Sequence, residues 1–179
     1  PRAGIVERLV RLGRSVPAGV QLGYHFCHGH ESHHRDRPYR AQPLVDMANA
    51  LSLSLGRSLD WVHLPVQCHA VDLPFFETLA TLRLHPETRL YLGLLDPSDG
   101  ELGARARIVA AQRFVHDFGV ATACGWARHR PGDVAALIEQ HRAVTSPIRP
   151  ATPARPGFAW PAGWQRLPDD DWARQPVDA

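Results

Sequence analysis

The segment from Tyr24 to Asp36, YHFCHGHESHHRD, concentrates residues that can bind a metal ion or transfer protons. It holds five histidines and Cys27, and imidazole and thiolate are the ligands that zinc prefers. His25 and Cys27 are two residues apart at the end of an expected strand, so their side chains should point to the same side. The segment therefore predicts a strand that ends in two metal ligands, followed by a polar loop.

The other histidines of this segment belong to the polar loop. They are His28, His30, His33 and His34. We expect most of them to be solvated or to face a substrate. His28 or His30 could titrate near neutral pH and transfer protons, and His28 is the candidate acid–base residue.

Two further candidate ligands lie at the ends of other expected strands. Cys124 ends the fourth strand and His63 lies near the end of the second. Ligands of parallel α/β folds bind at the carboxyl ends of the strands, so we expect both residues to meet His25 and Cys27 there. The alternative for Cys27 and Cys124 is that they are small buried apolar residues of their strands.

Carboxylates follow the third expected strand in LLDPSDGE, namely Asp96, Asp99 and Glu101. Asp96 is the second candidate catalytic residue, although it could instead form the turn. Asp99 is expected to serve in the turn and as the cap of the next helix. In the last loop, Arg128 could bind a carboxylate or phosphate, or it could be solvated.

Hydrophobic periodicity predicts four strands that alternate with helices. The expected helices cover 4–16, 43–56, 73–84, 101–119 and 133–144, and the expected strands cover 20–27, 60–66, 89–95 and 120–126. Gly56 and Gly119 are expected to end the helices that precede them. The alternation predicts an α/β fold with a parallel sheet, either a small open sheet or half of an eight-stranded barrel.

The last part of the chain has a different composition. Residues 145–157 are Pro-rich and predict an extended linker, and residues 158–179 contain three tryptophans without helical or strand periodicity. We interpret this tail as a wrapping segment or the start of another domain. Because the sequence begins at Pro1 and not at Met, we expect it to be part of a longer protein.

Composition narrows the class of protein. A formal net charge of +2 gives little reason to expect nucleic acid as a partner. Three scattered cysteines are too few for a disulfide framework, and no apolar run approaches the ~20 residues that cross a bilayer. We therefore expect a cytoplasmic protein that does not bind a membrane.

The stretches GYHFCHG and ATACGWARHRP resemble the C-terminal zinc barrel of cobalamin-independent methionine synthase, which shares a superfamily with uroporphyrinogen decarboxylase. In that family a His-x-Cys strand end and a Cys-Gly strand end supply zinc ligands, which implies His25, Cys27 and Cys124 here. The resemblance implies that residues 1–144 are the last four βα units of a (βα)8 TIM barrel. It also implies a zinc-dependent methyl (alkyl) transferase similar to 5-methyltetrahydrofolate–homocysteine methyltransferase, acting on a small-molecule thiol and a methyl donor.

One position departs from the family pattern. The family's next strand ends in a Glu that completes the zinc shell, whereas VHLPV has Pro65 near that place. His63 could replace the Glu as a ligand. The other candidates for the fourth place are Cys68, Glu77 and Glu101, or the place is empty.

Two other functions remain open from the sequence. One is a metal-free enzyme of the decarboxylase branch, in which Arg and Asp side chains at the strand ends do the chemistry. The other is a noncatalytic barrel that binds a metal or a ligand. A half barrel also has two open sheet edges, which favour a homodimer or pairing with a missing N-terminal half.

Overall fold

A computed structural model describes residues 2–27, 40–66, 73–124 and 130–145, all within the first of two compact units, Pro1–Pro147. Its helices are α1 (Arg2–Arg14), α2 (Gln42–Ser54), α3 (Leu73–Glu77), a 3₁₀ turn η2 (Thr78–Thr81), α4 (Gly100–Gln112) and α5 (Pro131–Val144). Its strands are β1 (Gly23–His25), β2 (Trp61–Pro65), β3 (Arg89–Leu95) and β4 (Gly119–Thr122). None of the helices in these ranges is long and apolar enough to cross a membrane.

The four strands form one parallel sheet in the order in which they occur in the chain. His25 pairs with His63, His63 with Tyr91, and Tyr91 with Gly119, so these four residues form one row across the sheet. The pairing of β3 with β4 is irregular between Gly93 and Leu95. The expected α/β fold with a parallel sheet is thus confirmed for the described residues, whereas closure into a barrel stays a prediction.

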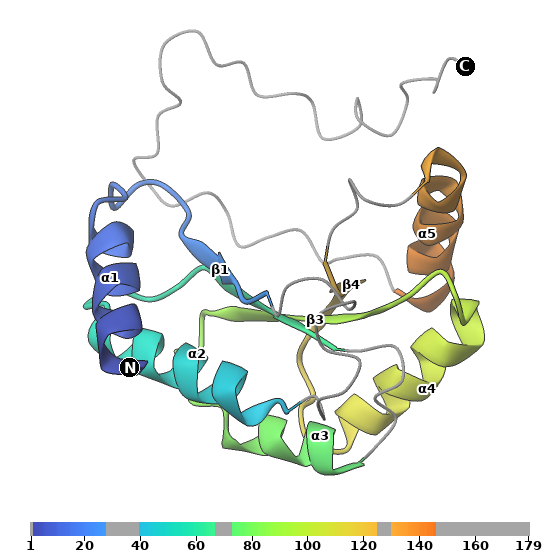
Figure 1. The fold of residues 1–179 in the computed structure, drawn as a ribbon, viewed down its shortest axis with the longest axis horizontal. Helices are drawn as coiled ribbons and strands as arrows, with labels where there is room; N and C mark the ends of the chain where they lie inside the picture. Colours follow the sequence, from blue (N-terminus) through green and yellow to red (C-terminus); the bar gives the residue numbers. More distant parts are fainter. Residues whose placement is uncertain (1, 28–39, 67–72, 125–129, 146–179) are drawn as a thin grey trace, which may run out of the picture. The chain divides into compact units, whose positions relative to one another are not determined.

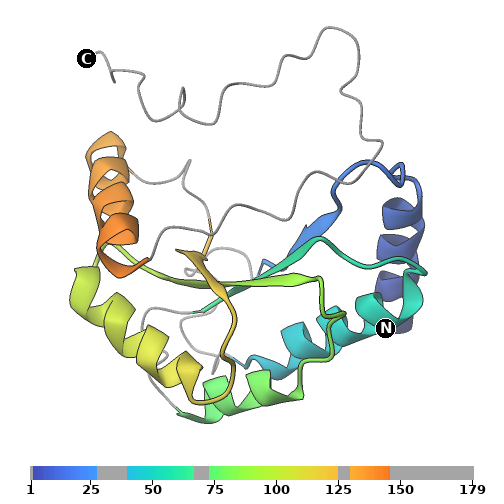
Figure 2. The ribbon, with the colours of Figure 1, turned by 180° about the vertical axis from the view of Figure 1, so that it is seen from behind.

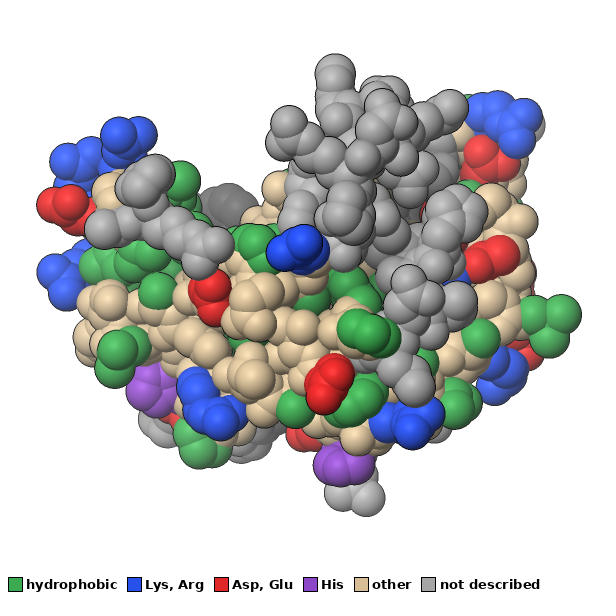
Figure 3. Space-filling view, turned by 60° about the horizontal axis from the view of Figure 1, so that its bottom comes forward, with side chains coloured by type: hydrophobic (Ala, Val, Ile, Leu, Met, Phe, Trp, Pro, Cys, Tyr) green, Lys and Arg blue, Asp and Glu red, His purple; other side chains and the backbone are tan. Residues whose placement is uncertain are grey.

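One face of the sheet carries the hydrophobic core. Alternate residues of the strands, such as Val62, Leu64 and Leu92, are buried there with apolar residues of α1, α2 and α3. The helices lie in an arc along this side of the sheet (Figures 1 and 2). Their solvent side carries interspersed cationic and anionic side chains (Figure 3). The strands and helices thus share one cluster of buried apolar side chains.

The opposite face of the sheet carries larger polar and aromatic side chains. The Trp61 ring covers Gly23, and the Tyr91 ring covers Gly119, so that a Cβ on either glycine would collide with the ring. His25 and His63 belong to the same face, because they stand two residues along their strands from Gly23 and Trp61. This face therefore carries two of the predicted site residues, His25 and His63.

The structure corrects three expected elements. The expected helix over 101–119 ends at Gln112, and Gly119 begins β4 and does not cap a helix. Gly119 is needed there for the close approach of the Tyr91 ring. The expected helix over 73–84 is a short helix followed by a 3₁₀ turn. The strand expected over 120–126 covers Gly119–Thr122 within the described residues, and positions 125 and 126 lie outside them.

Candidate metal centre

His25, Cys27 and Cys124 come together at the carboxyl ends of the outermost strands. His25 is the last residue of β1, Cys27 follows it by two residues, and Cys124 follows the end of β4 by two. The sulfur atoms of the two cysteines are 3.4 Å apart. One ligand atom from each of the three residues lies within 4.8 Å of the other two. The convergence expected of these three residues is therefore confirmed.

The spacing of these atoms fits a metal ion. With zinc bonds of about 2.0–2.3 Å, neighbouring ligands of a tetrahedral site are about 3.3–3.8 Å apart, and two sulfurs stand at the upper end of this range. The sulfurs here, 3.4 Å apart, would need to separate by about 0.4 Å, and the imidazole would need to shift by about 1.3 Å at most. A thiolate pair with an imidazole is also a donor set that zinc prefers. The three residues could hold a metal ion.

Curvature of the sheet makes the meeting of the two cysteines possible. β1 and β4 are the two edge strands, and three strand spacings of about 4.8 Å would separate them by roughly 14 Å in a flat sheet. The chain after β4 turns inward across β3, where a Cβ on Gly93 would lie 2.6 Å from the Ala123 Cα. Gly93 therefore gives the backbone beside Cys124 the room to approach.

His63 lies against His25 and outside the group of three. The Nδ1 atoms of the two rings are 2.5 Å apart, and the rings are stacked with centroids 4.7 Å apart and planes 19° apart. The Nε2 atom of His63 is buried and has no partner of good hydrogen-bond geometry among the described residues, although the Thr122 backbone lies close enough to affect the pKa of the ring. The structure thus brings His63 to the site without giving it a place among the close ligand atoms.

Burial keeps both imidazoles in the form that binds metals. It lowers the pKa of His25, and it lowers the pKa of His63 to about 4, with a further contribution from repulsion by His25. The backbone of Thr122 opposes part of the fall at His63. Both rings are therefore neutral at pH 7, and neutral imidazole is the ligating form.

The acidic candidates lie near the end of β3 but have local partners. Asp96 accepts hydrogen bonds at Oδ1 from the Ser98 backbone N–H, 2.8 Å away, and from the Ser98 hydroxyl, 2.5 Å away, as a turn-forming aspartate does. Asp99 occupies the cap position of α4, as expected, but its side chain does not cap the helix and instead pairs with Arg107. Glu101 pairs with Arg105 at 2.7 Å.

Several predicted residues cannot be placed. His28, the other loop histidines, Cys68 and Arg128 lie outside the described residues. Glu77 is exposed at the end of α3 and does not belong to the group of three ligands. The fourth ligand position is thus open to His63, to residues outside the described ranges, or to a substrate.

Arg107 and Gly93 are positioning residues that sequence reasoning missed. Arg107 is 1% exposed, donates from Nε to the Leu94 carbonyl at 2.7 Å, and holds both carboxylate oxygens of Asp99. It thereby joins the end of β3 to the start of α4. The sequence held a signal for each residue. Arg107 occupies a core position of a helix, and Gly93 lies in the middle of the buried strand RLYLGLL.

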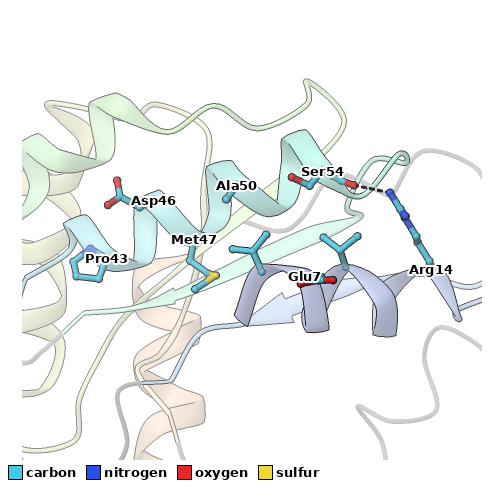
Figure 4. Close-up of a pocket in the computed structure, with 9 residues that line it drawn as sticks. Glu7, Arg14, Pro43, Asp46, Met47, Ala50 and Ser54 are labelled. Carbon is cyan, nitrogen blue, oxygen red and sulfur yellow. Dashed lines mark hydrogen bonds between the residues drawn. The ribbon is translucent and has the colours of Figure 1, made fainter. Parts of the chain in front are cut away.

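A groove elsewhere contains none of the predicted site residues. It lies between α1 and α2, has a volume of about 690 Å³, and is mainly apolar, with Met47 and Ala50 on one wall (Figure 4). Arg14 closes one end by donating to the Ser54 carbonyl at 3.1 Å. Its charged lining residues, Glu7, Arg14 and Asp46, are not among the predicted site residues.

Comparisons with known proteins give no family for this chain: no family model, curated protein or solved structure matches it.

Proposed function

We propose that this protein is a zinc-dependent alkyl transferase that activates a small-molecule thiol. The observation that carries the proposal is the meeting of Cys27 and Cys124, 97 residues apart in the chain, with sulfurs 3.4 Å apart and the His25 imidazole beside them. A metal ion that accepts two thiolates and one imidazole would use all three side chains at once.

The residues present supply three protein ligands of a site with one place left for a substrate. When bound, zinc would lower the pKa of a substrate thiol so that the thiolate exists at neutral pH. Cys27 is exposed, which leaves this position accessible to a small molecule. The same donor set supports the resemblance of the two strand ends to the zinc barrel of cobalamin-independent methionine synthase.

The topology is also compatible with the proposed barrel. Four parallel strands follow one another in sequence order, and the helices lie along one side of the sheet. Doubly wound sheets reverse their strand order and place helices on both faces. In a barrel, each right-handed strand–helix crossover adds the next strand on the same side of the previous one. We propose that residues 1–144 form four consecutive βα units of a (βα)8 barrel.

His63 is proposed to orient His25. A metal-binding histidine commonly uses its second ring nitrogen for a neighbour that fixes its tautomer and orientation. His63 Nδ1 is in contact with Nδ1 of His25, so Nε2 of His25 is the nitrogen left for the metal. In the competing assignment, His63 is the fourth metal ligand. That would require the two Nδ1 atoms to separate.

The proposal is tested by following the sulfur neighbours of zinc in the purified full-length protein. X-ray absorption at the zinc edge should detect two sulfur neighbours, and three after addition of homocysteine, with no change after addition of homoserine, which lacks the sulfur. Bound zinc without a third sulfur would favour the noncatalytic metal-binding alternative. Turnover that survives exhaustive chelation would favour the metal-free branch.

A further inference from the structure

Cys27 and Cys124 place two thiols within reach of covalent bond formation. A disulfide bond is about 2.05 Å long, so the sulfurs, now 3.4 Å apart, need to approach by roughly 1.4 Å. Both residues lie beyond the ends of their strands, β1 ending at His25 and β4 at Thr122. Such a movement therefore requires no strand pairing to break.

We propose that Cys27 and Cys124 form a reversible disulfide when the protein meets a peroxide, and that this bond excludes a metal ion from the same sulfurs. The exclusion rests on the metal site proposed above. Formation of the bond itself rests only on the two thiols and their separation.

Access decides which sulfur reacts first. Cys27 is exposed, whereas Cys124 is half-buried, so a small oxidant in solution reaches Cys27 more readily. The Cys27 thiolate attacks one peroxide oxygen and breaks the O–O bond, which gives a sulfenic acid on Cys27 and a hydroxide; the hydroxide takes up the proton that the thiol had released and becomes the first water. Its sulfur is oxidised and the peroxide is reduced.

Cys124 is placed to complete the reaction. Its sulfur attacks the Cys27 sulfur, the S–O bond breaks, and the departing hydroxide takes a proton to leave as the second water. The sum is two thiols and one hydrogen peroxide converted to one disulfide and two waters. The nearby thiol thus intercepts the sulfenic acid before further oxidation to the irreversible sulfinic acid.

Metal binding and this disulfide compete for the same sulfur lone pairs. A thiolate carries the charge that a metal ion attracts, whereas a disulfide sulfur carries none. Oxidation would therefore release the metal, and reduction by a dithiol would restore the site. The pair would act as a redox switch on the thiol chemistry proposed for the protein.

The experiment compares zinc-loaded and chelator-treated full-length protein after addition of one equivalent of hydrogen peroxide. We expect the titre of reactive thiols to fall by two, and mass spectrometry of a non-reduced digest to identify a peptide pair linked through Cys27 and Cys124. Dithiothreitol should restore both thiols. In the zinc-loaded sample a colorimetric indicator should detect one zinc released for each disulfide formed.

Two variants control the assignment. Cys68→Ser should retain the link, whereas Cys124→Ser should accumulate oxidised acids on Cys27. Sulfinic or sulfonic acid on Cys27 of the unaltered protein, or a link to Cys68, would overturn the proposal. If the protein binds zinc but forms no Cys27–Cys124 disulfide, this inference is wrong and the proposed function stands. If the disulfide forms in a protein that never binds zinc, the disulfide stands and the proposed function is wrong.

Discussion

Gly93 of β3 lies directly beneath the backbone of Ala123, so closely that a Cβ on the glycine would be 2.6 Å from the Ala123 Cα. Ala123 precedes Cys124, whose sulfur contacts that of Cys27. The position of one proposed ligand therefore depends on a glycine in a different strand.

Gly93→Ala should weaken both the metal site and the fold. The added methyl group forces the segment with Cys124 outward, and changes behind the ligands of a metal site cost about 10–100-fold in affinity. Overpacking of this kind should lower the free energy of unfolding by about 1–3 kcal/mol. Competition with a fluorescent zinc chelator measures the affinity.

Gly132→Ala in α5 is the matched control, because nothing lies within 4 Å of a Cβ added there. It should leave zinc affinity unchanged. Equal affinities of the two variants would show that Gly93 does not position Cys124.

His63 should make the metal-free protein less stable in mild acid. Its pKa is about 4 in the folded state and 6.5 in the unfolded chain, so the unfolded state binds a proton first as the pH falls. Stability is full above pH 6.5 and is lost as the pH falls from there towards 4. Between pH 7 and pH 5 the loss should be about 1–2 kcal/mol after allowance for partial solvent exposure.

Urea unfolding of chelator-treated protein at these two pH values measures the loss. His63→Gln should reduce it, whereas substitution of the exposed His116 by Gln should not. A loss that is the same in wild type and His63→Gln would place the titrating group elsewhere.

Arg107→Leu should destabilise the fold strongly. It removes a buried guanidinium that satisfies the Leu94 carbonyl and the Asp99 carboxylate, and breaking such a network costs about 2–4 kcal/mol. Arg142→Leu removes an ion pair with Glu139 in which both side chains are 69% exposed. It should change stability by about 0.5 kcal/mol or less. Chemical denaturation that gives similar values for both would refute this role of Arg107.

Asp96→Asn separates a catalytic role from a structural one. Asn Oδ1 can accept the same hydrogen bonds from Ser98, so stability should change little. If Asp96 transfers a proton in the reaction, turnover should fall by about 10²–10⁴-fold. Unchanged turnover would leave Asp96 as a turn residue alone.

Much of the fold could be predicted from the sequence because apolar periodicity reports burial. The strand expected over 89–95 is β3 itself, since every residue from Leu90 to Leu95 is apolar or Gly and turn residues flank it. The helix expected over 101–119 was too long because Val115 and Phe118 continue the apolar pattern while packing on the core from a turn. Periodicity alone does not distinguish these two kinds of burial.

The candidate site was only partly predictable. The two-residue spacing of His25 and Cys27 fixes their common direction, but the distance from Cys27 to Cys124 depends on how far the sheet curls. The curvature of the sheet depends on contacts such as that of Gly93 with Ala123. The only sign of this contact in the sequence is a glycine within a strand. Stacking of His63 on His25 likewise follows from strand register, which the sequence does not specify.

The proposed metal site is tested by the zinc content of the purified protein, measured by plasma mass spectrometry. The same measurement is made on Cys27→Ser, Cys124→Ser and the control His116→Ala. His116 is exposed in the turn between α4 and β4, at the opposite ends of the strands from the site. We predict about one zinc per chain in wild type and the control, and its loss in both cysteine variants. No zinc in wild type, or the same zinc content in a variant lacking both cysteines, would contradict the account.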